Sequence, residues 1–238
     1  MDKSSSQKLS ISFDTDRLLE DLGRLSAEDW HVHEQTGLSY VRGRYLTAPL
    51  VAAHGSANDI ATYDSTDFRP TPILEKCPYF FDVVSRFKSS LSRVRLMQLT
   101  PGASLEEHVD LVDQGVDFHL ARFHVPIKTN PGSAMIVDGK RANMSPGECW
   151  YLDVGLPHSA SNHGAEERIH LVVDCFIDDF VNELVGYDII AHRRENAAIY
   201  QAHADKMIAE YQRELRKYKL KRLPGRILYR LKKLFGLH

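Results

Sequence analysis

The sequence predicts a mainly β protein, an antiparallel sandwich or jelly roll with flanking helices. Three observations support this fold class. Between residues 93 and 177, short apolar segments, several of them alternating, are separated at regular spacing by Gly, Pro and Asn turns. From residue 179 onward the chain has good helix formers and no proline before Pro224. With 238 residues, 43% of them hydrophobic, the chain is long enough for one sizeable core.

The N-terminal third is predicted to be mixed. Four leucines recur at helical spacing and predict a helix over residues 14–28, with Asp14 or Thr15 able to cap its start. Residues 30–75 contain short β-like pieces broken by turn formers. A short helix is expected over residues 79–90.

The strands are predicted in the middle of the chain, where turn residues such as Pro101-Gly102 and Pro146-Gly147 divide it. The predicted strands cover residues 93–99, 118–127, 134–139, 148–154 and 168–177. The fifth of these strands is strongly apolar, so we expect it to be buried.

The C-terminal part differs from the rest in charge. Residues 191–238 contain 13 Lys and Arg against 4 Asp and Glu, whereas the remainder contains 17 against 28. A last helix over residues 226–237 has an apolar face opposite a basic one, a pattern typical of a helix at an interface. We therefore expect a mainly β domain with N-terminal helices over residues 1–185 and a basic helical extension over 186–238. The extension could pack on the body, form a homodimer or contact a membrane surface.

Composition excludes several classes of protein. The net charge of −2 and the 26% of charged residues are those of an ordinary globular chain, not a disordered one. No apolar run is long enough to cross a bilayer, and no signal peptide is evident. Three scattered cysteines, Cys77, Cys149 and Cys175, without a CxxC motif, predict free thiols and a cytoplasmic location. Nucleic-acid binding is disfavoured because no binding motif is present and the body is acidic.

Three short segments contain candidate functional residues. His108 and Asp110 are two positions apart, so on an extended segment their side chains point to the same side. His158 follows 48 residues after Asp110, at the end of a predicted strand, and Arg168 begins a buried strand ten residues later. Two histidines and one carboxylate are the ligands of a facial metal triad. A buried guanidinium is costly unless it meets an anion, and its planar fork suits a carboxylate.

This ordered set resembles the iron(II)- and 2-oxoglutarate-dependent oxygenases, whose core is a double-stranded β-helix of the jelly-roll, cupin-like type. The segments RVRLMQLTPGASLEEHVD, RFHVPIKTNPGSAMIVDGK, MSPGECWYLDVGLPHSASNHG and RIHLVVD are more closely similar to the aspartyl/asparaginyl β-hydroxylase family. Bacterial proline cis-4-hydroxylases have a similar catalytic block. The resemblance covers roughly residues 90–178.

The resemblance implies a hydroxylase that uses Fe(II), 2-oxoglutarate and O2 and releases succinate and CO2. The residues that match its metal ligands are His108, Asp110 and His158. The residues that match its co-substrate contacts are Arg168, at the far carboxylate, and Arg122 and His124, at the other end. Arg122 could instead be the partner of a nearby acid. A serine that helps to hold the co-substrate in some members corresponds to Met97 here.

The substrate implied by the resemblance is a small molecule, most simply a free or peptide-borne amino acid. Its carboxylate would need a cation, and Arg93 and Arg95 alternate on one side of a strand. They could contact substrate or co-substrate, or lie on a solvent-facing edge. The other histidines of this region, His119, His163 and His170, are expected to be structural.

Two other functions remain open at this point. A cupin-like protein could bind a small molecule without catalysis. A zinc hydrolase could use the same two histidines and aspartate. Neither function needs an arginine ten residues after the second histidine.

Overall fold

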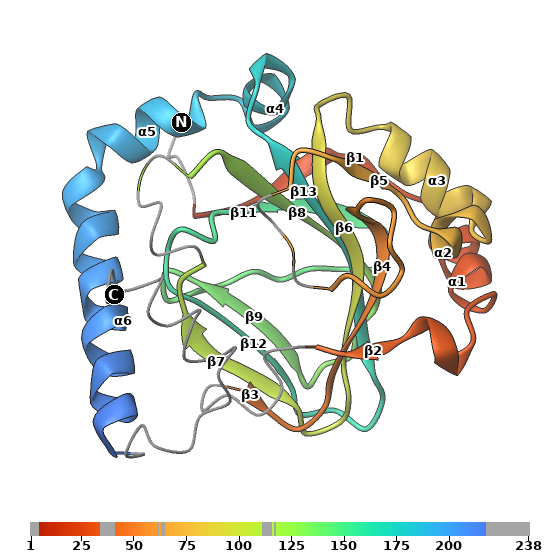
Figure 1. The fold of residues 1–238 in the computed structure, drawn as a ribbon, viewed down its shortest axis with the longest axis horizontal. Helices are drawn as coiled ribbons and strands as arrows, with labels where there is room; N and C mark the ends of the chain where they lie inside the picture. The colour runs from red at the N-terminus through yellow and green to blue at the C-terminus, as the bar shows by residue number, and fades with distance from the viewer. Residues whose placement is uncertain are drawn as a thin grey trace.

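Two antiparallel β-sheets form the centre of the molecule, which is seen here in a computed structural model (Figure 1). The structure describes residues 5–33, 41–60, 65–110 and 118–217, together with residues 62 and 116. The larger sheet contains, in spatial order, β1 (Ser6–Ser12), β11 (Glu148–Leu152), β8 (Leu120–Lys128), β13 (Arg168–Phe176), β6 (Leu91–Leu99), β4 (Tyr45–Ala53) and β2 (His31–Val32), with β5 (Phe68–Pro70) paired to β4. The smaller sheet contains β10 (Lys140–Arg141), β9 (Ser133–Val137), β12 (His158–Asn162), β7 (Ser104–His108) and β3 (Val41–Arg42).

The two sheets enclose a shared interior. Buried residues of both sheets, such as Leu99 and Leu152 of the larger and Val137 and Leu105 of the smaller, form one apolar cluster. This is the jelly-roll arrangement that the alternating segments predict, so the predicted fold class is confirmed.

Helices cover the larger sheet and also form the last part of the described chain. The helices are α1 (Thr15–Leu22), the 3-10 helix η1 (Ala27–Asp29), α2 (Pro72–Glu75), α3 (Pro78–Ser85), α4 (Asp179–Val185), α5 (Ile189–Glu195) and α6 (Ala197–Lys217). Leu18 of α1 and Phe80 of α3 pack with Phe123 and Leu171 in a second core on the outer face of the larger sheet. Figure 1 shows α5 and α6 on the opposite side of the molecule from α1, α2 and α3.

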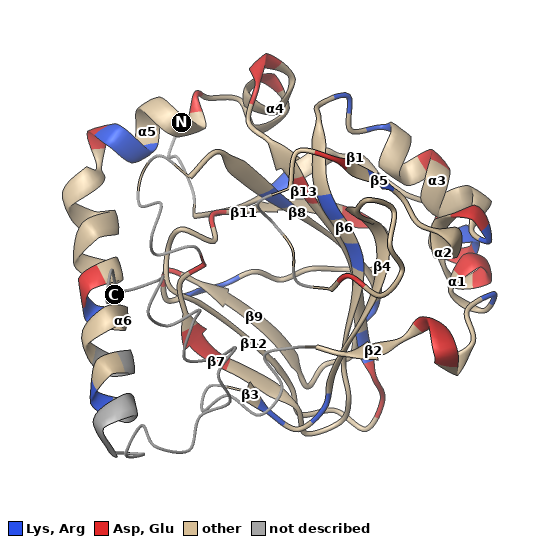
Figure 2. Ribbon diagram, in the orientation of Figure 1, with Lys and Arg blue, Asp and Glu red and all other residues tan. Residues whose placement is uncertain are grey.

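Strand alternation decides which side chains reach the interior. On β8 and β13 the odd-numbered residues belong to the outer core, which includes Phe123 and Leu171. The even-numbered residues therefore point between the sheets. These include Arg122 and Asp174, and a basic stretch of β6 runs beside them (Figure 2).

Several predicted elements differ in detail. The helix expected over residues 14–28 divides into α1 and η1, since α1 already ends at Leu22 and Gly23 caps it. The helix expected over residues 79–90 is the shorter α3. His158 begins β12, whereas a position at the end of a strand was expected; a turn separates it from β11.

All three cysteines are buried and unpaired by disulfides, as the sequence predicts. Burial raises the pKa of the Cys77 and Cys149 thiols to about 12. None of the helices in the described part of the chain has the length and apolar character needed to span a bilayer.

The C-terminal extension is helical as far as the structure describes it. The predicted helix over residues 226–237 lies outside the described residues, and the division at residue 185 stays a prediction. Arg193 of α5 is only 1% exposed and makes an ion pair with Asp153, which follows β11. The first helices of the extension are thus in contact with the sheet domain.

Candidate metal and co-substrate site

Three side chains with metal-ligating atoms meet at the end of the smaller sheet. His108 ends β7, Asp110 follows it in a bend, and His158 begins the neighbouring strand β12. The two histidines are partners across the antiparallel pair. Asp110 Oδ1 lies 3.6 Å from His108 Nε2 and 3.9 Å from His158 Nε2, and one ligand atom from each residue lies within 4.8 Å of the others. The structure brings together the three residues predicted as ligands.

Backbone hydrogen bonds orient both imidazoles. His108 Nδ1 lies 2.8 Å from the carbonyl oxygen of Glu106, and His158 Nδ1 lies 3.0 Å from that of Leu156. A carbonyl oxygen only accepts, so each Nδ1 carries the proton. Each Nε2 therefore presents a lone pair toward Asp110, which is the tautomer that a metal ligand needs.

Charge also prepares the three groups for a cation. Burial, with a contribution from His108, lowers the pKa of His158 to about 3, so this ring is neutral at pH 7. Burial opposes ionisation of Asp110, but Arg122 and the two histidines hold the pKa of its carboxyl far below the usual range. Two imidazoles and one carboxylate on one side fit Fe(II) and leave three coordination positions for other ligands.

Arg122 joins this site to a second buried carboxylate. Its Nη1 donates to Asp110 Oδ2, while its Nε donates to Asp174 Oδ1 at 2.7 Å and its Nη2 to Asp174 Oδ2 at 3.1 Å. Burial opposes the charge of Arg122, but the two aspartates raise the pKa of its guanidinium. Arg122 thus has the acidic partners that one interpretation of the sequence predicts, and its contact with a co-substrate stays a prediction.

Arg168 is the first residue of β13 and lies on the same inner face as Arg122. Arg122 itself is on β8, opposite Asp174 near the other end of β13. Arg168 is 4% exposed, and its Nη2 lies 3.2 Å from His170 Nδ1 and 3.9 Å from Met135 Sδ. In the part of the chain that the structure describes, it forms no ion pair with a carboxylate. Burial lowers the pKa of Arg168 to about 10, which shows the cost of holding this charge without an anion.

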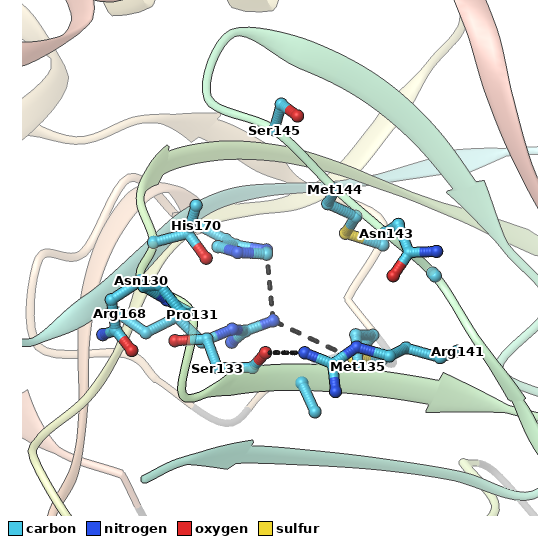
Figure 3. A pocket seen from close by; sticks show the side chains of 13 residues that line it. Asn130, Pro131, Ser133, Met135, Arg141, Asn143, Met144, Ser145, Arg168 and His170 are labelled. Carbon is cyan, nitrogen blue, oxygen red and sulfur yellow. Dashed lines mark hydrogen bonds between the residues drawn. The ribbon is translucent and has the colours of Figure 1, made fainter. Parts of the chain in front are cut away.

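A cavity of about 340 Å³ opens beside Arg168 (Figure 3). Arg168, His170, Met135, Ser133 and Arg141 are among the residues that line it, and Arg141 is held by the carbonyl oxygen of Ser133 at 2.6 Å. In Figure 3 the Arg168 guanidinium lies between His170 and Met135. The cavity gives the fork of Arg168 access to a small anion.

His124 and His170 lie between Arg168 and Arg122 on the inner face, as the register of β8 and β13 shows. Their Nδ1 atoms are 3.2 Å apart, and because Arg168 can only donate to His170 Nδ1, that atom is the acceptor and His124 Nδ1 the donor. Burial and the nearby charge of Arg168 hold the pKa of both rings well below the usual range, so both are neutral. His170 contacts Arg168, and the structural role expected for it stays a prediction.

Arg93 and Arg95 point the same way, as predicted, but they do not form a solvent-facing edge. They are 8% and 4% exposed, and both donate to Asp174 Oδ2, at 3.4 and 3.1 Å. Sequence reasoning missed Asp174, although its even spacing from Arg168 along an apolar strand places both on one face. Burial opposes ionisation of Asp174, but Arg122 and Arg95 lower the pKa of its carboxyl to about 2.

The comparison with known protein families decides the family. The model described as aspartyl/asparaginyl beta-hydroxylase matches residues 49–177, which is more than half of the chain. The chain belongs to this family. The match includes the three candidate metal ligands and all of β6, β8 and β13, so the segment that resembles the family is the segment that builds the site.

Two curated proteins of similar sequence are proline hydroxylases. The chain is 29% identical to L-proline cis-4-hydroxylase of Rhizobium meliloti over 167 residues, which cover 69% of this chain and 58% of that protein. It is 30% identical to L-proline cis-3-hydroxylase 2 of a Streptomyces species over 173 residues, 71% of this chain and 59% of that protein. The aligned part of the chain thus spans about three fifths of these relatives. A prolyl-4-hydroxylase from Pseudomonas putida aligns in structure with a TM-score of 0.46 and 14% identity, over 73% of this chain and 94% of that one.

Proposed function

We propose that the protein is an Fe(II)- and 2-oxoglutarate-dependent dioxygenase that hydroxylates an unactivated C–H bond of a free or peptide-borne amino acid. Succinate and CO2 are the other products. The observation that carries the proposal is Arg168, a guanidinium 4% exposed that faces a cavity without a carboxylate partner among the described residues. It lies on the inner face that also holds Arg122, the hydrogen-bond partner of Asp110. Neither a zinc hydrolase nor a binding protein needs a buried arginine that faces a cavity on the same inner face as the candidate metal site.

Each group of site residues has its own role in binding. His108, Asp110 and His158 would hold Fe(II), which supplies the oxidative chemistry at the positions left open. Arg168 binds the far carboxylate of 2-oxoglutarate as a charge-assisted pair, and His170 orients its fork. Arg122 pairs with Oδ2 of Asp110, whereas the imidazoles face Oδ1. This ion pair fixes the orientation of the Asp110 carboxylate.

The substrate belongs at the opposite end of the inner face. Arg168 and Asp174 are six residues apart on β13, roughly 20 Å at about 3.3 Å per residue, and Arg122 lies opposite Asp174 in register. Four buried arginines, Arg93, Arg95, Arg122 and Arg168, share this region with the buried Asp174 and the half-buried Asp110, so positive charge is in excess within this set. Arg95, beside Asp174, is the first candidate for the carboxylate of an amino acid. The names of the two proline hydroxylases support an amino-acid substrate.

An anaerobic titration tests the proposal. The protein is given Fe(II) and then 2-oxoglutarate, and the visible absorbance is scanned before and after each addition. We expect a weak band that needs both additions, and succinate formation once O2 and an amino acid are admitted. A panel of L-proline, acyclic amino acids and a proline-containing peptide identifies the substrate class. Metal binding without any response to 2-oxoglutarate would contradict the proposal.

Arg95→Met separates the substrate end from the co-substrate end. We expect KM for the amino acid to rise while the affinity for 2-oxoglutarate stays within about twofold. A change confined to 2-oxoglutarate would remove Arg95 from the substrate end.

A further inference from the structure

Asp153 begins the turn that leads from β11 to His158. The side chain is 2% exposed. Its Oδ1 accepts from the N–H of Gly155 at 3.2 Å, and its carbonyl oxygen accepts from the N–H of Leu156 at 3.1 Å. These bonds close a tight turn over residues 153–156. The shape of the turn is therefore set by one buried carboxylate.

The carbonyl oxygens of this turn contact two of the candidate metal ligands. The Val154 carbonyl accepts from the N–H of Asp110 at 3.0 Å, and the Leu156 carbonyl accepts from His158 Nδ1 at 3.0 Å. One bond fixes the backbone of the carboxylate ligand, and the other fixes the ring and tautomer of the histidine. A shift of the turn would move both ligands together.

The C-terminal helices hold the carboxylate of Asp153 at both oxygens. Arg193 Nη2 of α5 donates to Oδ1 at 2.9 Å, and the Tyr200 hydroxyl of α6 donates to Oδ2 at 2.7 Å. Arg193 Nη1 also donates to the carbonyl oxygen of Phe118 at 2.6 Å, just before β8. Gly155 packs so closely on α6 that a Cβ there would lie 3.3 Å from the Tyr200 ring.

The charges of this cluster are fixed. Burial opposes the charge of Arg193, but Asp153 raises the pKa of its guanidinium. Burial and Asp153 also raise the pKa of Tyr200, so its hydroxyl remains a donor. Removing Arg193 would leave a buried carboxylate without its cation, and the turn would have to move to bring that carboxylate to water.

We infer that Asp153, held by Arg193 and Tyr200, is a positioning residue for the metal centre. It sets the turn whose carbonyl oxygens orient Asp110 and His158. The C-terminal helices thereby contribute to metal affinity, although none of their described residues is a ligand. This inference rests on the proposed metal site but does not depend on 2-oxoglutarate or on the substrate.

Metal binding by the folded apoprotein tests the inference. The probe is Co(II), followed by titration calorimetry and by its visible absorption, with circular dichroism to verify folding. Arg193→Met should weaken Co(II) binding by about 10- to 100-fold, the usual cost of losing a group that orients ligands. Arg193→Lys should restore most of the affinity, since it returns the charge. Tyr200→Phe, which removes one hydrogen bond, should have a smaller effect in the same direction.

Asp21→Asn is the matched control. Asp21 is also a buried aspartate, 1% exposed; it accepts from the N–H of Phe80 at 2.8 Å and pairs with Arg24 at 3.2 Å, on the outer face of the larger sheet. It should lower thermal stability without changing Co(II) affinity beyond about twofold. The inference is overturned if folded Arg193→Met binds Co(II) as the wild type does, or if Asp21→Asn weakens binding equally.

Two further outcomes of these experiments have distinct meanings. If Arg193→Met does not fold, Tyr200→Phe decides, and unchanged affinity and spectrum in that variant overturn the inference. If the wild type itself does not bind Co(II), the metal site of the proposed function has failed, which is a different result.

Discussion

His158 lies directly opposite His108 in the antiparallel pair of β7 and β12, and the ring centroids are 4.2 Å apart. Each ring is also tied to a carbonyl oxygen two residues before it, at 2.8 and 3.0 Å. Register and local backbone therefore place two Nε2 atoms on one side of Asp110 before any metal arrives. Such prior ordering lowers the conformational cost of binding a cation.

Removing either imidazole should abolish metal binding and turnover. His108→Ala and His158→Ala each delete one of three ligands, and the remaining pair leaves the site with too few protein donors. Co(II) or Fe(II) affinity and succinate formation are measured together. His163→Ala, an exposed position in the turn after β12, is the control. Near-normal succinate formation by either ligand variant would show that the metal assignment is wrong.

Arg168→Leu should weaken 2-oxoglutarate binding more than metal binding. Loss of a charge-assisted pair in a buried pocket costs about 2–5 kcal/mol, or roughly 30-fold to several thousand-fold in affinity. Arg141→Leu is the matched control, because Arg141 lines the same cavity but donates to the carbonyl oxygen of Ser133. Calorimetry on the metal-loaded protein measures the 2-oxoglutarate affinity of both variants. Equal 2-oxoglutarate affinities of wild type and Arg168→Leu would remove Arg168 from the site.

Asp110→Gly should retain some metal and lose hydroxylation. The two imidazoles remain, but the variant loses the negative charge, the third facial ligand and one partner of Arg122. Metal content and product formation are measured on the same sample. Hydroxylation above about a tenth of the wild-type rate would indicate a site that works with two histidines alone.

Stability should fall in acid because buried histidines must become charged on unfolding. Burial lowers the pKa of His33 to about 3, with Arg95 and Arg93 acting in the same direction. Between pH 6.5 and about 3 the unfolded state therefore binds a proton that the folded state does not, so stability decreases as pH falls. This one group accounts for a loss on the order of 4 kcal/mol over the whole window.

Urea unfolding of the apoprotein at pH 7, 5.5 and 4.5 measures this dependence. His33→Phe, which can keep the ring stacked on Tyr45 at 4.2 Å, should make the dependence shallower. His119→Phe, at an exposed position, should leave it unchanged. The same slope in all three proteins would contradict the assignment to His33.

The basic tail should be separable from catalysis. Residues 224–238 lie outside the described residues, and the candidate metal and co-substrate residues all precede residue 170. Truncation after Leu223 should leave 2-oxoglutarate turnover largely intact and change association, measured by size-exclusion chromatography and liposome sedimentation. Loss of turnover would mean that the tail completes the active site, and identical behaviour of both forms would mean that it packs on its own body.

The sequence predicts β6, β8, β9, β11 and β13 well because alternation and turn residues act locally, but the predicted strands do not include β7 and β12, which carry His108 and His158. It also predicts the convergence of His108, Asp110 and His158, because the ordered set resembles the metal ligands of a known family. It does not predict β1, whose single buried hydrophobic residue, Leu9, gives a weak pattern and whose position depends on pairing with β11.

The buried carboxylates show a second limit. Asp174 and Asp153 meet their arginines across 52 and 40 positions of the chain, and nothing local identifies either pair of partners. Only the pleat places Asp174 beside Arg122, through pairing of β13 with β8. Long-range register, rather than local propensity, decides which charges share the interior.

The burial of Cys77, Cys149 and Cys175 has a practical consequence for measuring motion in this protein. With all three thiols in the core, the folded chain offers no accessible native target to a maleimide at neutral pH. A cysteine introduced at Gln201, on the exposed side of α6, would therefore be the single labelled position. A fluorophore or spin label there reports whether the mobility or local environment of α6 changes when metal and co-substrate are added.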